Sequence, residues 1–267
     1  MTANADSPAL AIRPLSILHL LVWTTFTALF LASVSDNSLQ LPPTEQASRI
    51  VSLSLYGLIA MTEGAALTGM VFLLPFLLSN SGRRRLEPGH WILIAWGTIG
   101  IGELLCNAGM RIWLVWDDEV SSMVSLNGSY YLILHGAAGV ALAFGWRIGS
   151  FERPWSVYFV LKIISAGALG LAGIVQTILY FGFSLAIEEA FEPFTIIFAL
   201  ILIVLCVGSI LEVVAFVTFV VAAIRDRNAG RHRDWLHRVA VVLVMTWPAI
   251  ITIIWFGERL IYYLSDN

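Results

Sequence analysis

The chain of 267 residues is 58% hydrophobic and only 12% charged. This composition excludes a water-soluble globular domain of that size and is typical of a protein that crosses a membrane several times. The net charge of −3 is an average over two faces of opposite sign, described below, and we expect no nucleic-acid partner.

Seven apolar blocks follow one another along the chain, and each is long enough to cross a hydrocarbon core that requires about 20 residues. We therefore predict an all-α, polytopic transmembrane bundle of seven helices that forms a single domain over residues 1–267. An alternative for the first block is a cleaved secretory signal, which would leave six helices, but its apolar run is longer than the usual signal. The predicted helices are 14–35, 50–78, 91–116, 126–146, 155–185, 194–224 and 235–264.

Arginines and acidic residues alternate from one connection to the next. Every second connection is rich in arginine. The connections between these, together with the C-terminal end, hold ten acidic residues but only Arg49 and Arg259. Because positively charged loops stay in the cytoplasm, we predict a cytoplasmic N-terminus, an outside C-terminus and location in the inner (cytoplasmic) membrane. The run Arg225–Arg238 could also bind an anionic lipid headgroup. Eleven arginines lie on the predicted cytoplasmic side: Arg13, Arg83, Arg84, Arg85, Arg147, Arg153, Arg225, Arg227, Arg231, Arg233 and Arg238.

Four ionisable residues lie well inside apolar blocks: Glu63, Glu103, Glu212 and Lys162, the only lysine of the chain. An ionisable group at the centre of a bilayer costs a few kcal/mol, so each of these residues is a candidate for function. With a rise of about 1.5 Å per residue, Glu63 and Glu103 lie near the midplane. Lys162 and Glu212 lie nearer the cytoplasmic face on consecutive helices, and we predict that they can pair.

Further polar residues extend this set into three layers. Glu103, Asn107 and Arg111 recur every four residues and form one stripe along the third predicted helix. Gln176 on the fifth predicted helix lies near the level of Arg111. The layers are Lys162, Glu212 and His19 toward the cytoplasm, then Glu63, Glu103 and Asn107, then Arg111 and Gln176.

Two interpretations of these layers remain open. In the first, they form a proton or ion path through the bundle. In the second, they are structural: Lys162 extends to the near face, Arg111 meets the acidic residues 117–119, and the glutamates are protonated or paired and hold helices together.

Catalytic and cofactor motifs give little support for an enzyme. The sequence contains no H-E-x-x-H, no G-x-S-x-G and no glycine-rich phosphate loop, which favours a protein without catalytic activity. No cofactor or metal is predicted, because no two histidines on one predicted helix have the spacing that binds haem or a metal ion. The last block lacks the lysine that attaches retinal in rhodopsin-like proteins.

Several short motifs lie between the third predicted helix and the C-terminal end, and they consist of Glu103, Gly109, Leu126, Asn127, Ser129, Gln176, Tyr180, Trp247 and Trp255. Together they resemble subunit III of the haem-copper oxidases. The chain departs from that family where its H-G-x-H-V and W-H-F-V-D motifs and its histidine-rich stretch would stand. The resemblance implies a non-catalytic subunit beside a redox core, with Glu103 near a proton-entry or lipid site. The first block also resembles the first helix of uncharacterised bacterial multi-pass proteins.

Three functions are therefore expected from the sequence. The first is a non-catalytic subunit or helper of a membrane complex, such as a respiratory one, with other membrane subunits as partners. The second is a proton-coupled transporter of a small solute that uses Glu63 and Glu103. The third is a passive membrane organiser or sensor. The lipid bilayer is an expected partner.

Overall fold

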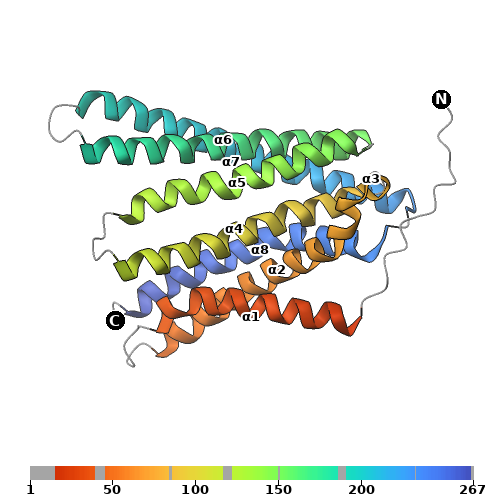
Figure 1. Ribbon diagram of the computed structural model, residues 1–267, viewed down its shortest axis with the longest axis horizontal. Helices are drawn as coiled ribbons and strands as arrows, with labels where there is room; N and C mark the ends of the chain where they lie inside the picture. Colours follow the sequence, from red (N-terminus) through yellow and green to blue (C-terminus); the bar gives the residue numbers. More distant parts are fainter. Residues whose placement is uncertain are drawn as a thin grey trace.

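The computed structural model describes residues 16–39, 46–83, 86–116, 122–149, 151–185, 191–231 and 233–265. Within these ranges all regular secondary structure is helical, which confirms the predicted all-α class. Seven helices are long and one is a single turn (Figure 1): α1 (Ile17–Leu39), α2 (Gln46–Leu78), α3 (Asn80–Arg83), α4 (Pro88–Trp116), α5 (Ser122–Ile148), α6 (Arg153–Leu185), α7 (Phe191–Asn228) and α8 (Trp235–Ser265).

Five helical segments among the described residues are long and apolar enough to cross a membrane. A shorter apolar segment, Ile17–Ser33, belongs to α1. The chain is thus a multi-helix membrane protein. The five segments are Leu53–Leu78, Pro88–Cys106, Arg153–Thr177, Ala199–Asn228 and Trp235–Gly257.

The helices extend slightly beyond the apolar blocks, because local signals and not hydrophobicity set their ends. Helix α4 begins at Pro88, whose fixed φ and missing N–H suit the first helical position. Helix α7 continues to Asn228, and Gly230 follows it with a φ of 65°, a conformation that commonly ends a helix and that favours glycine. Helix α8 continues through Pro248.

The helices lie side by side, and α4 is central. It packs against α1, α2, α5 and α8, while α6 lies between α5 and α7. In Figure 1, α6 and α7 lie along one edge of the molecule and α1 along the other. The largest fully buried side chains are aromatic: Trp91, Trp155, Phe159 and Phe219.

Three connections meet at one end of the bundle, the right end in Figure 1. Their described residues are 79–83 with 86–87, 149 with 151–152, and 229–231 with 233–234. These connections and the adjoining helix ends carry most of the arginines of the chain. We call this the basic end.

Candidate functional site

Glu63 is a carboxyl group enclosed in the centre of the apolar bundle. It lies on α2 and is only 2% exposed. The indole Nε1 of Trp96, on α4, donates a hydrogen bond of 2.8 Å to its Oε1. A buried carboxyl requires hydrogen-bond partners, because leaving water removes its solvation. Here the partner is an uncharged donor from a neighbouring helix.

A glycine of α4 makes room for this carboxyl. A Cβ atom at Gly100 would lie 3.0 Å from Oε2 of Glu63 and 3.1 Å from the ring of Phe30 on α1. The ring of Trp247, on α8, packs edge-on against Trp96 with centroids 5.1 Å apart. Four helices, α1, α2, α4 and α8, therefore surround Glu63 and the indole that bonds it.

The second carboxyl oxygen of Glu63, Oε2, is buried and has no hydrogen-bond partner among the described residues. Glu103 lies three residues beyond Gly100 on α4, and its charge interacts with that of Glu63. The sequence predicted that both glutamates lie near one level. The structure brings them close enough to interact. Two neighbouring carboxyls in a low-dielectric interior favour a shared proton over two negative charges.

Lys162 and Glu212 form the ion pair that the sequence predicted. Nζ of Lys162 lies 2.5 Å from Oε2 of Glu212, and the hydroxyl of Ser165 lies 2.7 Å from Oε1. His135, on α5, interacts electrostatically with both partners. The side chains of Lys162 and Glu212 are 29% and 35% exposed, so the pair lies at the surface of α6 and α7.

Of the other predicted site residues, the structure describes the side chains of His19 and Gln176. His19 packs against Phe72 and Trp235, with ring centroids 3.9 and 5.1 Å away. Gln176 lies fourteen positions beyond Lys162 on α6, or about 21 Å along the helix. The side chains of Asn107 and Arg111 lie outside the described residues.

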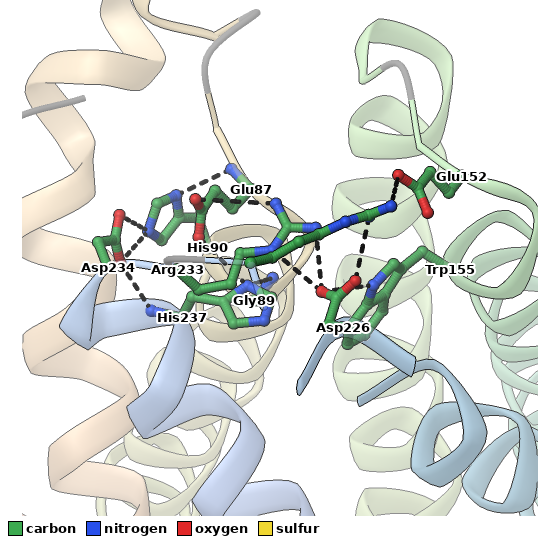
Figure 2. A network of polar contacts seen from close by, with 10 residues as sticks. Glu87, Gly89, His90, Glu152, Trp155, Asp226, Arg233, Asp234 and His237 are labelled. Atoms are coloured by element: carbon green, nitrogen blue, oxygen red, sulfur yellow. Dashed lines mark hydrogen bonds and ion pairs between the residues drawn. The ribbon is translucent and has the colours of Figure 1, made fainter. Parts of the chain in front are cut away.

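A third polar group, at the basic end, joins the starts of α4 and α8 (Figure 2). Both helices follow the pattern acid-x-x-His: Glu87 precedes His90, and Asp234 precedes His237. The N–H of Glu87 donates to Nδ1 of His90 at 3.0 Å, and the N–H of Gly89 donates to Nδ1 of His237 at 3.0 Å. Each imidazole thus accepts an N–H that would otherwise lack a partner at the start of a helix.

Asp234 completes this arrangement from the other side. Its Oδ1 accepts the backbone N–H of His237 at 2.9 Å, as expected of a residue that caps a helix. The same oxygen lies 2.9 Å from Nε2 of His90. Because Nδ1 of His90 accepts a hydrogen bond, Nε2 carries the proton and donates it to Asp234. The starts of α4 and α8 therefore cap one another.

Asp226, near the end of α7, joins the three connections of the basic end. It is buried and accepts hydrogen bonds from Trp155 at 3.1 Å, Arg231 at 3.2 Å and Arg233 at 3.0 Å. Arg231 also pairs with Glu152 in the connection between α5 and α6. Two arginines of the run Arg225–Arg238 are thus bound to carboxylates of the protein itself.

The two acids that precede α4 and α8 have opposite pKa shifts. Burial raises the pKa of Glu87, and the charge of Asp234 raises it further, against the opposing effects of His90 and Arg233. Burial alone would also raise the pKa of Asp234. The hydrogen bond and charge of His90, with the backbone amide and charge of His237, lower it overall.

Glu87, His90 and Asp234 have possible metal-ligating atoms within 4.8 Å of one another. The hydrogen bonds do not fit a metal ion. Nδ1 of His90 already accepts the N–H of Glu87, so a metal at Nε2 would require an imidazole without any proton. Ligating histidines normally donate from their other ring nitrogen. The arrangement is a hydrogen-bond network and not a metal centre.

The sequence contains a local signal for this network, although neither hydropathy nor charge distribution predicts it. An acid three residues before a histidine, at the start of a predicted helix, follows the spacing of a capping box. In this chain histidine replaces the usual glutamate at the third helical position.

Comparisons with protein-family models, with curated proteins and with solved structures found no match.

Proposed function

We propose that this protein is a proton-coupled transporter of a small solute, in which Glu63 and Glu103 bind and release the proton. The observation that carries this proposal is the environment of Glu63. Its carboxyl is 2% exposed, accepts one bond from an uncharged indole and keeps a buried oxygen without a partner among the described residues. Such a group is favoured to hold a proton, and Oε2 is the atom that receives it.

The second carboxyl makes proton release plausible in chemical terms. Glu103 interacts with Glu63 and is less deeply buried. When one of the two carboxyls ionises, the other is favoured to keep the proton, so the pair can pass a single proton from α2 to α4. A change in the packing of α1, α2, α4 and α8 would then be coupled to the protonation of the pair.

The proposed topology has seven transmembrane helices in the inner (cytoplasmic) membrane. The basic end faces the cytoplasm, which places the N-terminus inside and the C-terminus outside. Arg225, Arg227 and Arg238 are exposed at this end. They are the members of the run Arg225–Arg238 that we expect to contact anionic lipid headgroups.

The proposal is tested by charge movement in proteoliposomes adsorbed on a solid-supported membrane. Pools of neutral amino acids, monosaccharides and short monocarboxylates serve as probes, each applied in a concentration jump under acidic and neutral conditions. We expect a pH-dependent current with at least one pool, lost in Glu63→Gln and kept in Glu152→Gln, a control outside the membrane-spanning segments. Absence of current with every pool, or an unchanged current in Glu63→Gln, would contradict the proposal.

A second function, a helper subunit of a membrane complex, is favoured by the Lys162 and Glu212 pair. Its side chains are about one-third exposed on helices that otherwise present apolar residues to the membrane. A partner subunit that packs on α6 and α7 would cover this pair. Cross-linking in native membranes from positions near Glu212 should then capture one defined partner, whereas a lone species would argue against this function.

A further inference from the structure

Glu87 and His237 are in contact at the junction of α4 and α8. Nδ1 of His237 accepts the N–H of Gly89 at 3.0 Å. Oε2 of Glu87 lies 3.5 Å from that same Nδ1. This oxygen is buried and has no hydrogen-bond partner among the described residues. Two acceptor atoms therefore face each other, and a single proton placed between them would turn this contact into a hydrogen bond.

We propose that Glu87 and His237 form a proton-operated latch between α4 and α8. In the closed form, Glu87 is ionised and Nδ1 of His237 accepts the N–H of Gly89. In the open form, one proton taken up from solvent lies between Oε2 of Glu87 and Nδ1 of His237. The ring nitrogen then no longer accepts the N–H of Gly89, and the start of α4 loses this one of its hydrogen bonds to the start of α8.

The charged groups around Glu87 define what the proton must compete with. Arg233, from the connection between α7 and α8, lies 3.8 Å from Oε1, and the backbone amide of Asp234 also bonds this carboxylate. Arg233 is itself held by two contacts with Asp226, at 2.9 and 3.0 Å. Arg233 is therefore shared between two carboxylates, and its contact with Asp226 is shorter than its contact with Glu87.

The electrostatics of Glu87 agree with this geometry. Burial and the charge of Asp234 raise its pKa above the usual value of about 4.3. Asp234 lies 2.8 Å from Nε2 of His90, and its pKa is lowered. As the pH falls, Glu87 therefore takes up a proton before Asp234 does. The contact between His90 and Asp234 still joins the two helices while the latch opens.

The latch links the protonation state of the basic end to the attachment of α8. Helix α8 carries Trp247, which packs on Trp96, and α4 carries Glu103. Opening the latch would loosen one end of α4 and α8, two of the four helices that surround Glu63 and its indole partner. The inference does not rest on transport, because it concerns only the hydrogen bonds at the start of α4.

The test measures hydrogen exchange of the Gly89 amide in the full-length protein in lipid nanodiscs, detected by NMR with glycine-selective labelling. Each measured rate is divided by the intrinsic chemical exchange rate at the same pH. We expect exchange to become about fivefold faster between neutral and acidic pH, the factor expected for loss of one capping bond. In Glu87→Gln the side-chain NH2 of the new glutamine donates to Nδ1 of His237 at every pH. The N–H of Gly89 is then without its acceptor, so its exchange should be fast throughout. In His237→Asn an acceptor that does not titrate replaces Nδ1, so exchange should be slow throughout.

Glu152→Gln is the matched control, because Glu152 belongs to the same network but pairs with Arg231. It should keep the pH profile of the parent protein, as should Glu63→Gln, whether or not that variant transports. A pH-independent Gly89 in the parent protein would overturn the proposal. A Glu87→Gln variant that retains the parental profile would also overturn it. If Glu87→Gln does not fold, the comparison of the parent protein with His237→Asn decides, and a His237→Asn variant with the parental pH profile would overturn the proposal.

Discussion

Two glutamates inside the apolar helices, Glu63 and Glu212, have opposite surroundings. Glu212 lies 2.5 Å from the ammonium of Lys162 and bonds the hydroxyl of Ser165. Glu63 has an uncharged donor, Trp96, on one oxygen and no partner among the described residues on the other. A cation stabilises the ionised form of Glu212, whereas nothing comparable does so for Glu63. The comparison teaches that carboxyls inside the apolar helices of one chain can have surroundings of opposite electrostatic character.

The largest expected effect comes from removing the cation beside Glu212. Lys162→Met leaves the carboxylate unpaired in an apolar environment and should lower the free energy of unfolding by about 3 kcal/mol. Unfolding in mixed detergent micelles measures this loss. The double variant Lys162→Met with Glu212→Leu should recover most of it. A single variant as stable as the parent would show that the ion pair contributes little.

Filling the space beside Glu63 should cost less. In Gly100→Ala the new methyl group would lie 3.0 Å from Oε2 of Glu63 and 3.1 Å from Phe30, so α4 and its neighbours must shift. We expect destabilisation of about 2 kcal/mol, typical of overpacking. Gly109→Ala, where a Cβ atom meets nothing within 4 Å, is the matched control. Equal stabilities of the two variants would contradict the close packing at Glu63.

Asp234 extends the comparison to a carboxylate that has several donors. Its pKa is lower in the folded protein than in the unfolded chain. The ionised carboxylate therefore stabilises the fold fully above the ordinary aspartate pKa of about 4. This contribution is lost as the pH falls through the lower pKa of the folded protein. In Asp234→Asn the amide oxygen can still cap α8, but the ionised acceptor of His90 is lost, so stability should fall by about 1 kcal/mol at neutral pH. Thermal unfolding should show this difference vanish in acid, and a difference that persists there would argue against the ionised cap.

The smallest effect is expected for Glu63→Gln. The amide oxygen can still accept the bond from Trp96, and the variant removes no charge if Glu63 holds a proton. Stability should change by less than about 0.5 kcal/mol, against a clear loss for Glu212→Gln, whose charge pairs with Lys162. Parallel unfolding curves of the two variants measure the contrast. Equal losses would mean that Glu63 is also ionised.

Depth and spacing predicted part of the site from the sequence. Counting residues from the helix ends placed Lys162 and Glu212 on consecutive helices at levels from which their long side chains can meet, and they do. The same reasoning placed Glu63 and Glu103 near one level. It could not predict Trp96 as the partner of Glu63, because the two residues lie 33 positions apart on helices whose rotation depends on packing.

The basic end shows a different limit of prediction. The arginine run was interpreted through membrane topology, which needs no partner for each side chain. The structure binds Arg231 and Arg233 to Asp226, because the end of α7 and the loop that follows fold back on a buried carboxylate. Helix ends were predicted within a few residues, since apolar length fixes most of each helix, whereas capping by His90 and His237 depends on how two helices meet.

The most direct test of the account is the protonation state of Glu63 at neutral pH. Infrared spectroscopy of the full-length protein in lipid nanodiscs detects the C=O stretch of a protonated carboxyl separately from carboxylate bands. We predict such a band in the parent protein, its loss in Glu63→Gln and its persistence in Glu212→Gln. A parent spectrum without the band, or a band unchanged in Glu63→Gln, would contradict the claim that Glu63 holds a proton.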